Sequence, residues 1–190
     1  FGARQVSAVS MQAISGAGYP GIASLDILNN VVPYIGGEEE KIEQETRLLL
    51  GRMEGGRRLE AEVVVSAQAN RVPVLDGHTI CLSVGFGARP TVAEAVSALA
   101  DYRGPDQVRG LPSAPEQPIL VRAEPDRPQP RRDRDAGRGM AVTVGRVRPC
   151  PLLDLRLVSV SHNTLRGAAG GSILNAELLV TMGYLGDSGE

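Results

Sequence analysis

Short strand-like runs interleaved with helices are the feature that most restricts the fold of this chain. Residues 59–67 form an extended apolar run, and residues 79–86 alternate apolar and polar side chains as a half-buried strand does. The remaining predicted strands cover the ranges 4–11, 118–122, 140–148 and 153–160. Several of these strands lie close together in pairs, which suggests an α+β or mixed-sheet domain.

The helix signals fall between these strands. Residues 38–52 begin with an acidic turn, which suits the helix dipole. Their inner face is expected to be mixed, formed by Ile42, Glu45, Thr46 and Leu49. Thr91, followed by Glu94, predicts a capping box at the start of a helix over 91–102. Further helices are predicted for 24–29 and 170–182. The pattern indicates an α+β fold with a mixed β-sheet and helices on one face.

Composition limits the classes of function. The 190 residues are 42% hydrophobic and 22% charged, which allows one ordinary domain or one domain plus an appendage. The net charge of -2 predicts no nucleic-acid partner. No apolar run is long enough to span a membrane, so no membrane partner is expected. Cys81 and Cys150 are interpreted as free thiols of a cytoplasmic protein, and no metal site is predicted.

The connection over residues 70–79 carries the strongest candidate chemistry. Pro73 and Gly77 mark it as a link between two strands. Arg71 offers a planar fork to a carboxylate or phosphate, and His78 can exchange a proton near neutral pH. The plain alternative is a surface arginine and a hydrogen-bonded structural histidine.

A glycine-rich stretch over residues 15–21 contains a formal G-x-G-x-x-G pattern. We reject it as a dinucleotide fingerprint, because Pro20 removes a backbone N–H where a helix N-terminus should bind pyrophosphate. An active-site loop that lets substrate approach the backbone is the preferred interpretation. Residues 124–139 are dense in Pro, Arg and Asp; an ordered loop or subunit-contact arm is favoured there over a linker.

Five segments together resemble the aspartate-semialdehyde dehydrogenase family, in its archaeal and fungal branch. Residues 70–79 (NRVPVLDGHT) resemble its catalytic-histidine segment, and the others match in the family's order: 12–21 (QAISGAGYPG), 33–41 (PYIGGEEEK), 133–140 (DRDAGRGM) and 161–170 (SHNTLRGAAG). The resemblance covers essentially this whole chain but only the second half of the family's protein.

The resemblance implies a fold and an assembly. It implies the C-terminal domain of the glyceraldehyde-3-phosphate-dehydrogenase type, used for catalysis and for forming a homodimer or homotetramer. Residues 1–157 would be this catalytic and dimerisation domain. Residues 158–190 would be a cofactor-proximal segment and a C-terminal helix that packs on an absent N-terminal Rossmann domain.

The resemblance also implies a role for each site residue. His78 would be the acid/base, and Gln12 would lie beside the reacting carbonyl. Arg71 would clamp the substrate's α-carboxylate, while Glu38 and Lys41 would hold its ammonium and phosphate groups. The residues near the cofactor, NADP, would be Ser15, Gly16, Asn163, Gly167, Ala169 and Gly170. Glu38 and Lys41 could otherwise be a solvated helical pair, and His162 is interpreted as structural.

The implied activity is NADP-dependent conversion of L-aspartyl 4-phosphate into L-aspartate 4-semialdehyde and phosphate. The family's cysteine nucleophile and dinucleotide fingerprint do not occur in this sequence, so we expect no turnover from this chain by itself.

Three alternatives stay open. Malonyl-CoA reductase and N-acetylglutamyl-phosphate reductase belong to the same superfamily, although Lys41 with Arg71 favours a small amino-acid acyl phosphate over a CoA thioester. A dimerisation module without catalysis is the third, and the missing nucleophile favours it.

Overall fold

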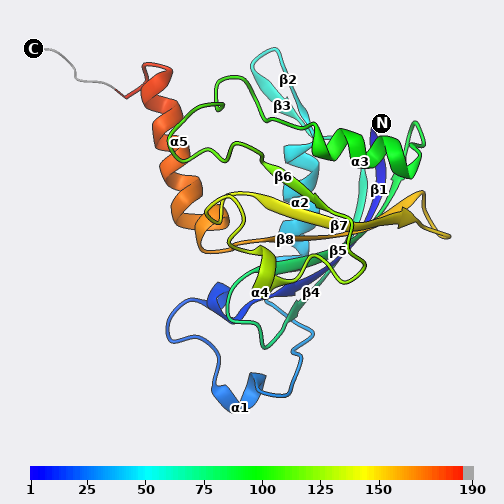
Figure 1. Ribbon diagram of the computed structural model, residues 1–190, viewed down its shortest axis with the longest axis vertical. Helices are drawn as coiled ribbons and strands as arrows, with labels where there is room; N and C mark the ends of the chain where they lie inside the picture. Colours follow the sequence, from blue (N-terminus) through cyan, green and yellow to red (C-terminus); the bar gives the residue numbers. More distant parts are fainter. Residues whose placement is uncertain (186–190) are drawn as a thin grey trace, which may run out of the picture.

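A six-stranded mixed sheet forms the centre of the computed structural model, which describes residues 1–185 (Figure 1). Its strand order is β4-β1-β5-β8-β7-β6. The strands are β1 (Ala3–Gln12), β4 (Val64–Arg71), β5 (His78–Phe86), β6 (Ile119–Arg122), β7 (Val142–Pro149) and β8 (Leu155–Ser161). The pairs β1–β4 and β6–β7 are parallel and the other neighbours are antiparallel, which confirms the predicted mixed sheet.

The longer helices match the predicted ones, with shorter ends. They are α2 (Glu38–Leu49), α3 (Val92–Ala100) and α5 (Gly170–Thr181), and single turns form α1 (Ser24–Ile27) and α4 (Pro130–Asp133). The capping box before α3 is confirmed: Glu94 N donates to Thr91 Oγ1 at 3.2 Å, and Thr91 N donates to Glu94 Oε2 at 2.8 Å.

The strand predicted over 59–67 is wrong at its start. A hairpin of β2 (Arg52–Glu54) and β3 (Arg57–Leu59) precedes it, turning through Gly55 and Gly56, which both have positive φ. The hairpin residues are exposed, so they lack the alternation by which a half-buried strand is predicted. The helix predicted over 38–52 therefore ends earlier, at Leu49, and its last predicted residue, Arg52, belongs to β2.

Helix α2 packs along the outer edge of the sheet through carboxylates. Ala67 N donates to Glu43 Oε1 at 3.0 Å, and Ala69 N donates to Glu39 Oε1 at 2.9 Å. These backbone groups belong to β4, the outermost strand. The predicted packing through Leu49 is wrong, since that side chain is 73% exposed. The acidic residues on α2 satisfy free strand N–H groups, which a search for apolar contacts overlooks.

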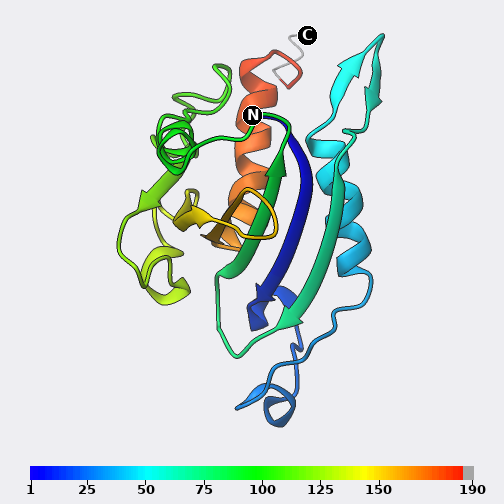
Figure 2. The same cartoon turned by 90° about the vertical axis from the view of Figure 1, so that its right-hand side faces the viewer.

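One face of β4, β1 and β5 carries no helix, and α2 and α5 lie behind these strands in Figure 2. Strand register places Ser7 beside Ser66 and Ser83 on one face. Ser7 and Ser66 are exposed there, whereas Ala8 and Ala67 on the opposite face are buried. The core therefore lies on the helix side of these strands, and the serine side is open.

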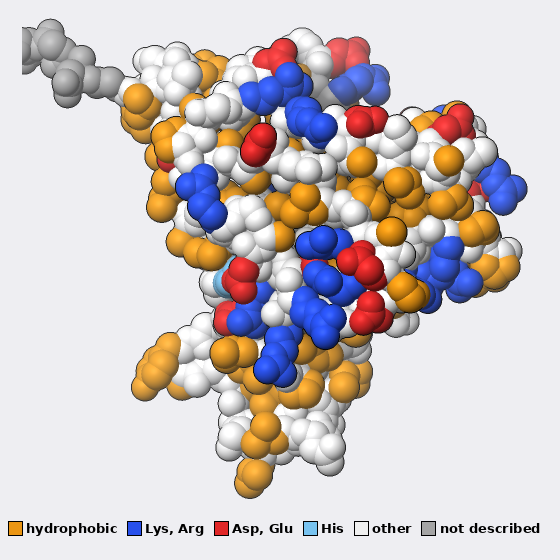
Figure 3. Space-filling view, viewed as in Figure 1, with side chains coloured by type: hydrophobic (Ala, Val, Ile, Leu, Met, Phe, Trp, Pro, Cys, Tyr) orange, Lys and Arg blue, Asp and Glu red, His pale blue; other side chains and the backbone are white. Residues whose placement is uncertain are grey.

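The segment over 124–139 is ordered, as predicted, around a buried carboxylate. Asp133 is 1% exposed and accepts hydrogen bonds from the guanidinium groups of Arg127 and Arg122 and from Gln129 N. Burial by itself would raise the pKa of Asp133, but these hydrogen bonds hold it below its usual value. Basic side chains gather over this region of the surface (Figure 3).

The domain boundary expected at residue 157 falls inside β8, so residues 158–161 belong to the sheet. Within residues 1–185, no helix is long and apolar enough to cross a membrane.

Candidate active site

Three strands bring Gln12, Arg71 and His78 into one row. Gln12 is the last residue of β1, Arg71 is the last of β4, and His78 is the first of β5. The parallel register pairs Gln12 with Arg71, and the antiparallel register pairs Met11 with Thr79, which places Gln12 opposite His78. Residues opposite one another in a sheet share a face. The sequence predicted each residue, and the sheet brings them together.

Ala13 orients two of these side chains through its main chain. Its N–H donates to His78 Nδ1 at 3.1 Å, and its carbonyl oxygen accepts from Arg71 Nη1 at 2.8 Å. Ala13 has no exposed surface, so this anchor is rigid. Because Nδ1 accepts a hydrogen bond, the neutral imidazole carries its proton on Nε2.

Gly16 approaches the row closely. A Cβ atom on this residue would lie 2.8 Å from Arg71 Nη1 and 2.9 Å from His78 Cε1. Side chains do not tolerate such distances, so the loop can pass only because residue 16 is a glycine. The glycine-rich stretch thus covers the acid/base candidate and does not open a dinucleotide-binding helix.

Electrostatics keep His78 neutral at physiological pH. Burial, together with the positive charge of Arg71, lowers the pKa of His78 from 6.5 to about 4, although Glu38 partly opposes this. Burial also lowers the pKa of Arg71, against the opposing charge of Glu38. The site therefore contains a neutral imidazole beside a buried cation, an arrangement that favours the arrival of an anion.

Glu38 links the row to the first turn of α2. Gln12 Nε2 donates to Glu38 Oε1 at 3.0 Å, and Lys41 Nζ lies 3.8 Å from Glu38 Oε2. The Lys41 side chain is 56% exposed. Glu38 and Lys41 are thus the predicted i,i+3 pair, and the structure adds the contact with Gln12 that connects this pair to His78.

Of the residues expected near the cofactor, Ser15 and Asn163 meet beside the row. Asn163 Nδ2 donates to Ser15 Oγ at 2.8 Å, and Gly77 N donates to Asn163 Oδ1 at 2.9 Å. Gly167 and Ala169 lie further along, in the exposed π-helical turn Leu165–Ala169. A Cβ at Gly167 would meet nothing closer than 4.0 Å, so packing does not require a glycine at this position.

Packing explains why residue 170 is a glycine, and His162 makes its contacts outside the row. A Cβ on Gly170 would lie 2.5 Å from Met140 Sδ, so its glycine permits α5 to start against Met140. His162 is 8% exposed; its Nδ1 lies 3.1 Å from Thr164 Oγ1 and its Nε2 lies 3.7 Å from Asp135 Oδ1. These contacts support a structural role for His162.

Neither cysteine belongs to the row. Cys81 pairs with Val158 on β8 whereas His78 pairs with Ser161, and three residues along a strand place the two side chains on opposite faces. Cys150 is buried beyond β7, where backbone hydrogen bonds from Leu153 and Leu152 lower its pKa.

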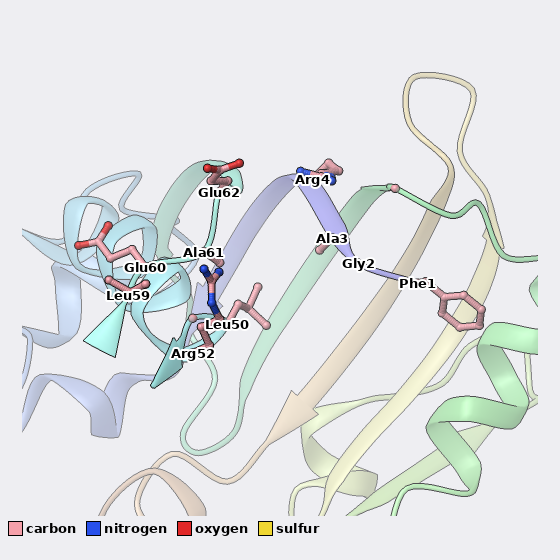
Figure 4. A pocket seen from close by; sticks show the side chains of 12 residues that line it. Phe1, Gly2, Ala3, Arg4, Leu50, Arg52, Leu59, Glu60, Ala61 and Glu62 are labelled. Atoms are coloured by element: carbon pink, nitrogen blue, oxygen red, sulfur yellow. The ribbon is translucent and has the colours of Figure 1, made fainter. Parts of the chain in front are cut away.

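A hollow lies at the start of β1, at the opposite end of this strand from Gln12. It measures about 700 Å³, and its walls include Phe1, Arg4, Leu50, Arg52 and Glu62. In Figure 4, Leu50 and Arg52 lie on one side of the start of β1 and Phe1 on the other. Gln12, Arg71 and His78 lie at the far end of their strands, so this hollow is separate from the candidate site.

The sheet and the row place the chain among the semialdehyde dehydrogenases. Residues 1–166 match the family described as semialdehyde dehydrogenase, dimerisation domain, and the chain belongs to this family. Aspartate-semialdehyde dehydrogenase of Schizosaccharomyces pombe is 54% identical over 187 residues, covering 95% of this chain and 52% of that protein. The Archaeoglobus fulgidus enzyme of the same name is 52% identical over 181 residues, covering 95% and 51%.

A solved structure supports the same family assignment. Aspartate semialdehyde dehydrogenase with NADP from Candida albicans superposes with a TM-score of 0.86 at 45% identity, covering 96% of this chain and 52% of that one. The resemblance to the archaeal and fungal branch is confirmed. The chain spans about half the length of these relatives.

Proposed function

We propose that this chain is the catalytic and dimerisation half of an NADP-dependent aspartate-semialdehyde dehydrogenase located in the cytoplasm. It would convert L-aspartyl 4-phosphate into L-aspartate 4-semialdehyde and phosphate. The observation that carries the proposal is the row of Gln12, Arg71 and His78, two of whose side chains are fixed by the main chain of Ala13. A merely structural histidine and arginine would not need a shared main-chain anchor together with a glycine that packs this closely against both.

His78 would exchange the proton of the tetrahedral adduct. Its Nδ1 is held by Ala13 N, so Nε2 is the atom that is free to face the substrate. The depressed pKa of His78 keeps the ring neutral with its proton on Nε2, so this N–H would donate a hydrogen bond to the oxygen of the adduct as negative charge develops on it. NADPH would supply the hydride, and a cysteine in the other half of the protein would be the nucleophile.

Arg71 would bind the α-carboxylate of the substrate. Its guanidinium is buried, and Nη1 is fixed on Ala13 O, which leaves its other donors for a ligand. Glu38 would bind the ammonium group, and Gln12, which donates to Glu38, would lie beside the reacting carbonyl. Lys41 would bind the phosphate, for which its exposed ammonium can swing away from Glu38.

A fusion protein tests this proposal. The N-terminal half of the S. pombe relative would be joined to this chain, and NADP reduction would be followed with aspartate semialdehyde and phosphate. We expect turnover from the fusion and none from this chain by itself. A folded fusion that reduces malonyl-CoA or N-acetylglutamyl phosphate instead would select one of the related enzymes. Inactivity with all three substrates would favour the non-catalytic dimerisation module.

The open face of the sheet supports a symmetric dimer. Gln5, Ser7, Ser66 and Gln68 are exposed on neighbouring strands, with Val9 half-buried between them. We propose that two copies pack these faces together. Ser7→Arg should convert a dimer into a monomer in light scattering, whereas Ser97→Arg on the exposed surface of α3 should not. A wild-type monomer at micromolar concentration would contradict the dimer.

The C-terminal helix has an apolar surface that fits the missing half. Ile173, Val180 and Met182 are more than half exposed on or directly after α5. We propose that this surface packs on the N-terminal Rossmann domain. The segment expected to serve this role ran to residue 190, and its last residues, 186–190, lie outside the described residues.

A further inference from the structure

Two loops run side by side above the row. The first is the 3-10 turn Ile14–Ala17, which carries Gly16; the second is the connection before His78. Their main chains are joined, since Ile14 N donates to Val74 O at 2.7 Å and Ser15 N donates to Leu75 O at 3.1 Å. The distance between Gly16 and the His78 ring therefore depends on how firmly these loops are held together.

Asn163 supplies a further join through its side chain. Its Oδ1 accepts from Gly77 N at 2.9 Å, one residue before His78, and its Nδ2 donates to Ser15 Oγ at 2.8 Å, one residue before Gly16. Asn163 follows β8, whose Ser161 pairs with His78. It thus connects the two loops directly beyond the last pair of the β5–β8 ladder.

The opposite side of the turn is closed by α4. A Cβ on Gly77, whose φ is +98°, would lie 3.1 Å from Arg134 Cβ and 3.2 Å from Pro130 Cβ. Arg134 Nη1 also donates to Asp76 O at 3.3 Å. Gly77 is therefore held between α4 on one side and the amide of Asn163 on the other, and Asn163 adds a side-chain link to the main-chain bonds that join this turn to the Gly16 loop.

We propose that Asn163 is a positioning residue, whose amide sets His78 against Gly16, and not chiefly a ligand of the cofactor. Its effect on catalysis rests on the function proposed above, whereas its effect on the two loops does not. The fit leaves little tolerance, because a Cβ on Gly16 would already lie within 3 Å of the imidazole. A displacement of about 1 Å at an acid/base group can cost about 10²-fold in rate.

The structural part is tested on this chain by NMR. Asn163→Ala should accelerate hydrogen exchange of the Gly77 amide by about tenfold or more, because a hydrogen bond that protects it is lost. Asn163→Asp should restore most of the protection, since a carboxylate oxygen can accept from Gly77 N while the other accepts from the Ser15 hydroxyl. Asn175→Ala, on an exposed position of α5, is the control. Unchanged exchange at Gly77 in Asn163→Ala would overturn the proposal.

The catalytic part is tested in the fusion protein. Asn163→Ala should lower kcat by about 10- to 100-fold and leave the KM for NADP within about threefold. Asn163→Ala and Ser15→Ala should be non-additive, because each breaks the same hydrogen bond. A raised KM for NADP with an unchanged kcat would show a cofactor ligand and overturn the proposal. If the wild-type fusion is inactive but Asn163→Ala accelerates exchange of the Gly77 amide as expected, the result would instead contradict the proposed function.

Discussion

In the row of the site, His78 and Arg71 are both hydrogen-bonded to the buried main chain of Ala13, whereas Lys41 is half exposed and lies 3.8 Å from its nearest carboxylate. The first pair has its geometry before any substrate arrives. Lys41 carries a positive charge near the candidate site, but its side chain is free to move. Acid/base chemistry and carboxylate binding need fixed directions, whereas binding a phosphate as a point charge does not. The largest losses should therefore follow changes in the row.

The strongest way to break the row is His78→Gln in the fusion protein. We expect kcat to fall by about 10²–10⁴-fold with little change in KM, since proton transfer acts in the transition state. Cys81→Ser is the matched control, because Cys81 lies on the other face of the same strand and should leave steady-state turnover unaltered. A His78→Gln enzyme with near-normal kcat would remove His78 from the mechanism.

The pH dependence of stability probes the same residue without any assay of activity. The pKa of His78 is about 4 in the folded chain, below its ordinary 6.5, so the unfolded chain binds more protons between these values. The free energy of unfolding should fall as pH drops from 6.5 towards 4, by up to about 3 kcal/mol from this group. Urea unfolding of wild type and His78→Gln at pH 4.5 and 7 measures it. If the free energy of unfolding has the same pH dependence in wild type and His78→Gln, the His78 ring is not buried in its neutral form.

Arg71→Lys tests whether the row needs a fork or only a charge. The ammonium keeps the positive charge but loses the second hydrogen bond to a carboxylate. We expect the KM for aspartate semialdehyde to rise by about 10- to 150-fold, from roughly 1.5–3 kcal/mol of lost binding, with a smaller change in kcat. A KM within about twofold of wild type would mean that Arg71 does not bind the substrate.

Lys41→Ala should have the smallest effect and the most selective one. The exposed pair with Glu38 contributes at most about 0.5 kcal/mol to stability, so folding should be nearly unchanged. In the direction that consumes phosphate, the KM for phosphate should rise more than the KM for the semialdehyde. Equal effects on the two KM values would mean that Lys41 is only a solvated surface residue. They would also weaken the case for an acyl-phosphate enzyme.

Local signals in the sequence predicted local structure well. Thr91 and Glu94 are three residues apart, so the capping box needs nothing outside its own turn, and it is present. The hairpin at Gly55 and Gly56 was missed because its exposed strands bury no face. The acidic start of the helix was interpreted only through the helix dipole, although Glu39 and Glu43 accept hydrogen bonds from β4. Only the strand order shows that β4 needs partners at its edge.

The candidate residues were named one by one from the sequence, but their connections were not. Gln12, Arg71 and His78 are separated by up to 66 positions, and their common row follows from the parallel and antiparallel registers. The role of Ala13 lies in its peptide groups, which no side-chain pattern reveals. The hydrogen bonds of Asn163 to Gly77 and Ser15 likewise depend on where β8 ends, 86 and 148 positions away.

The carboxylates of α2 also limit the addition of a strand from another molecule to this sheet. Three alternate outward N–H groups of β4 have acceptors within the chain: Ala67 on Glu43, Ala69 on Glu39, and Arg71 on Val32 O. An incoming strand from another molecule would have to displace these acceptors before it could add to the sheet. Edge-to-edge polymerisation of this protein along β4 is thus disfavoured.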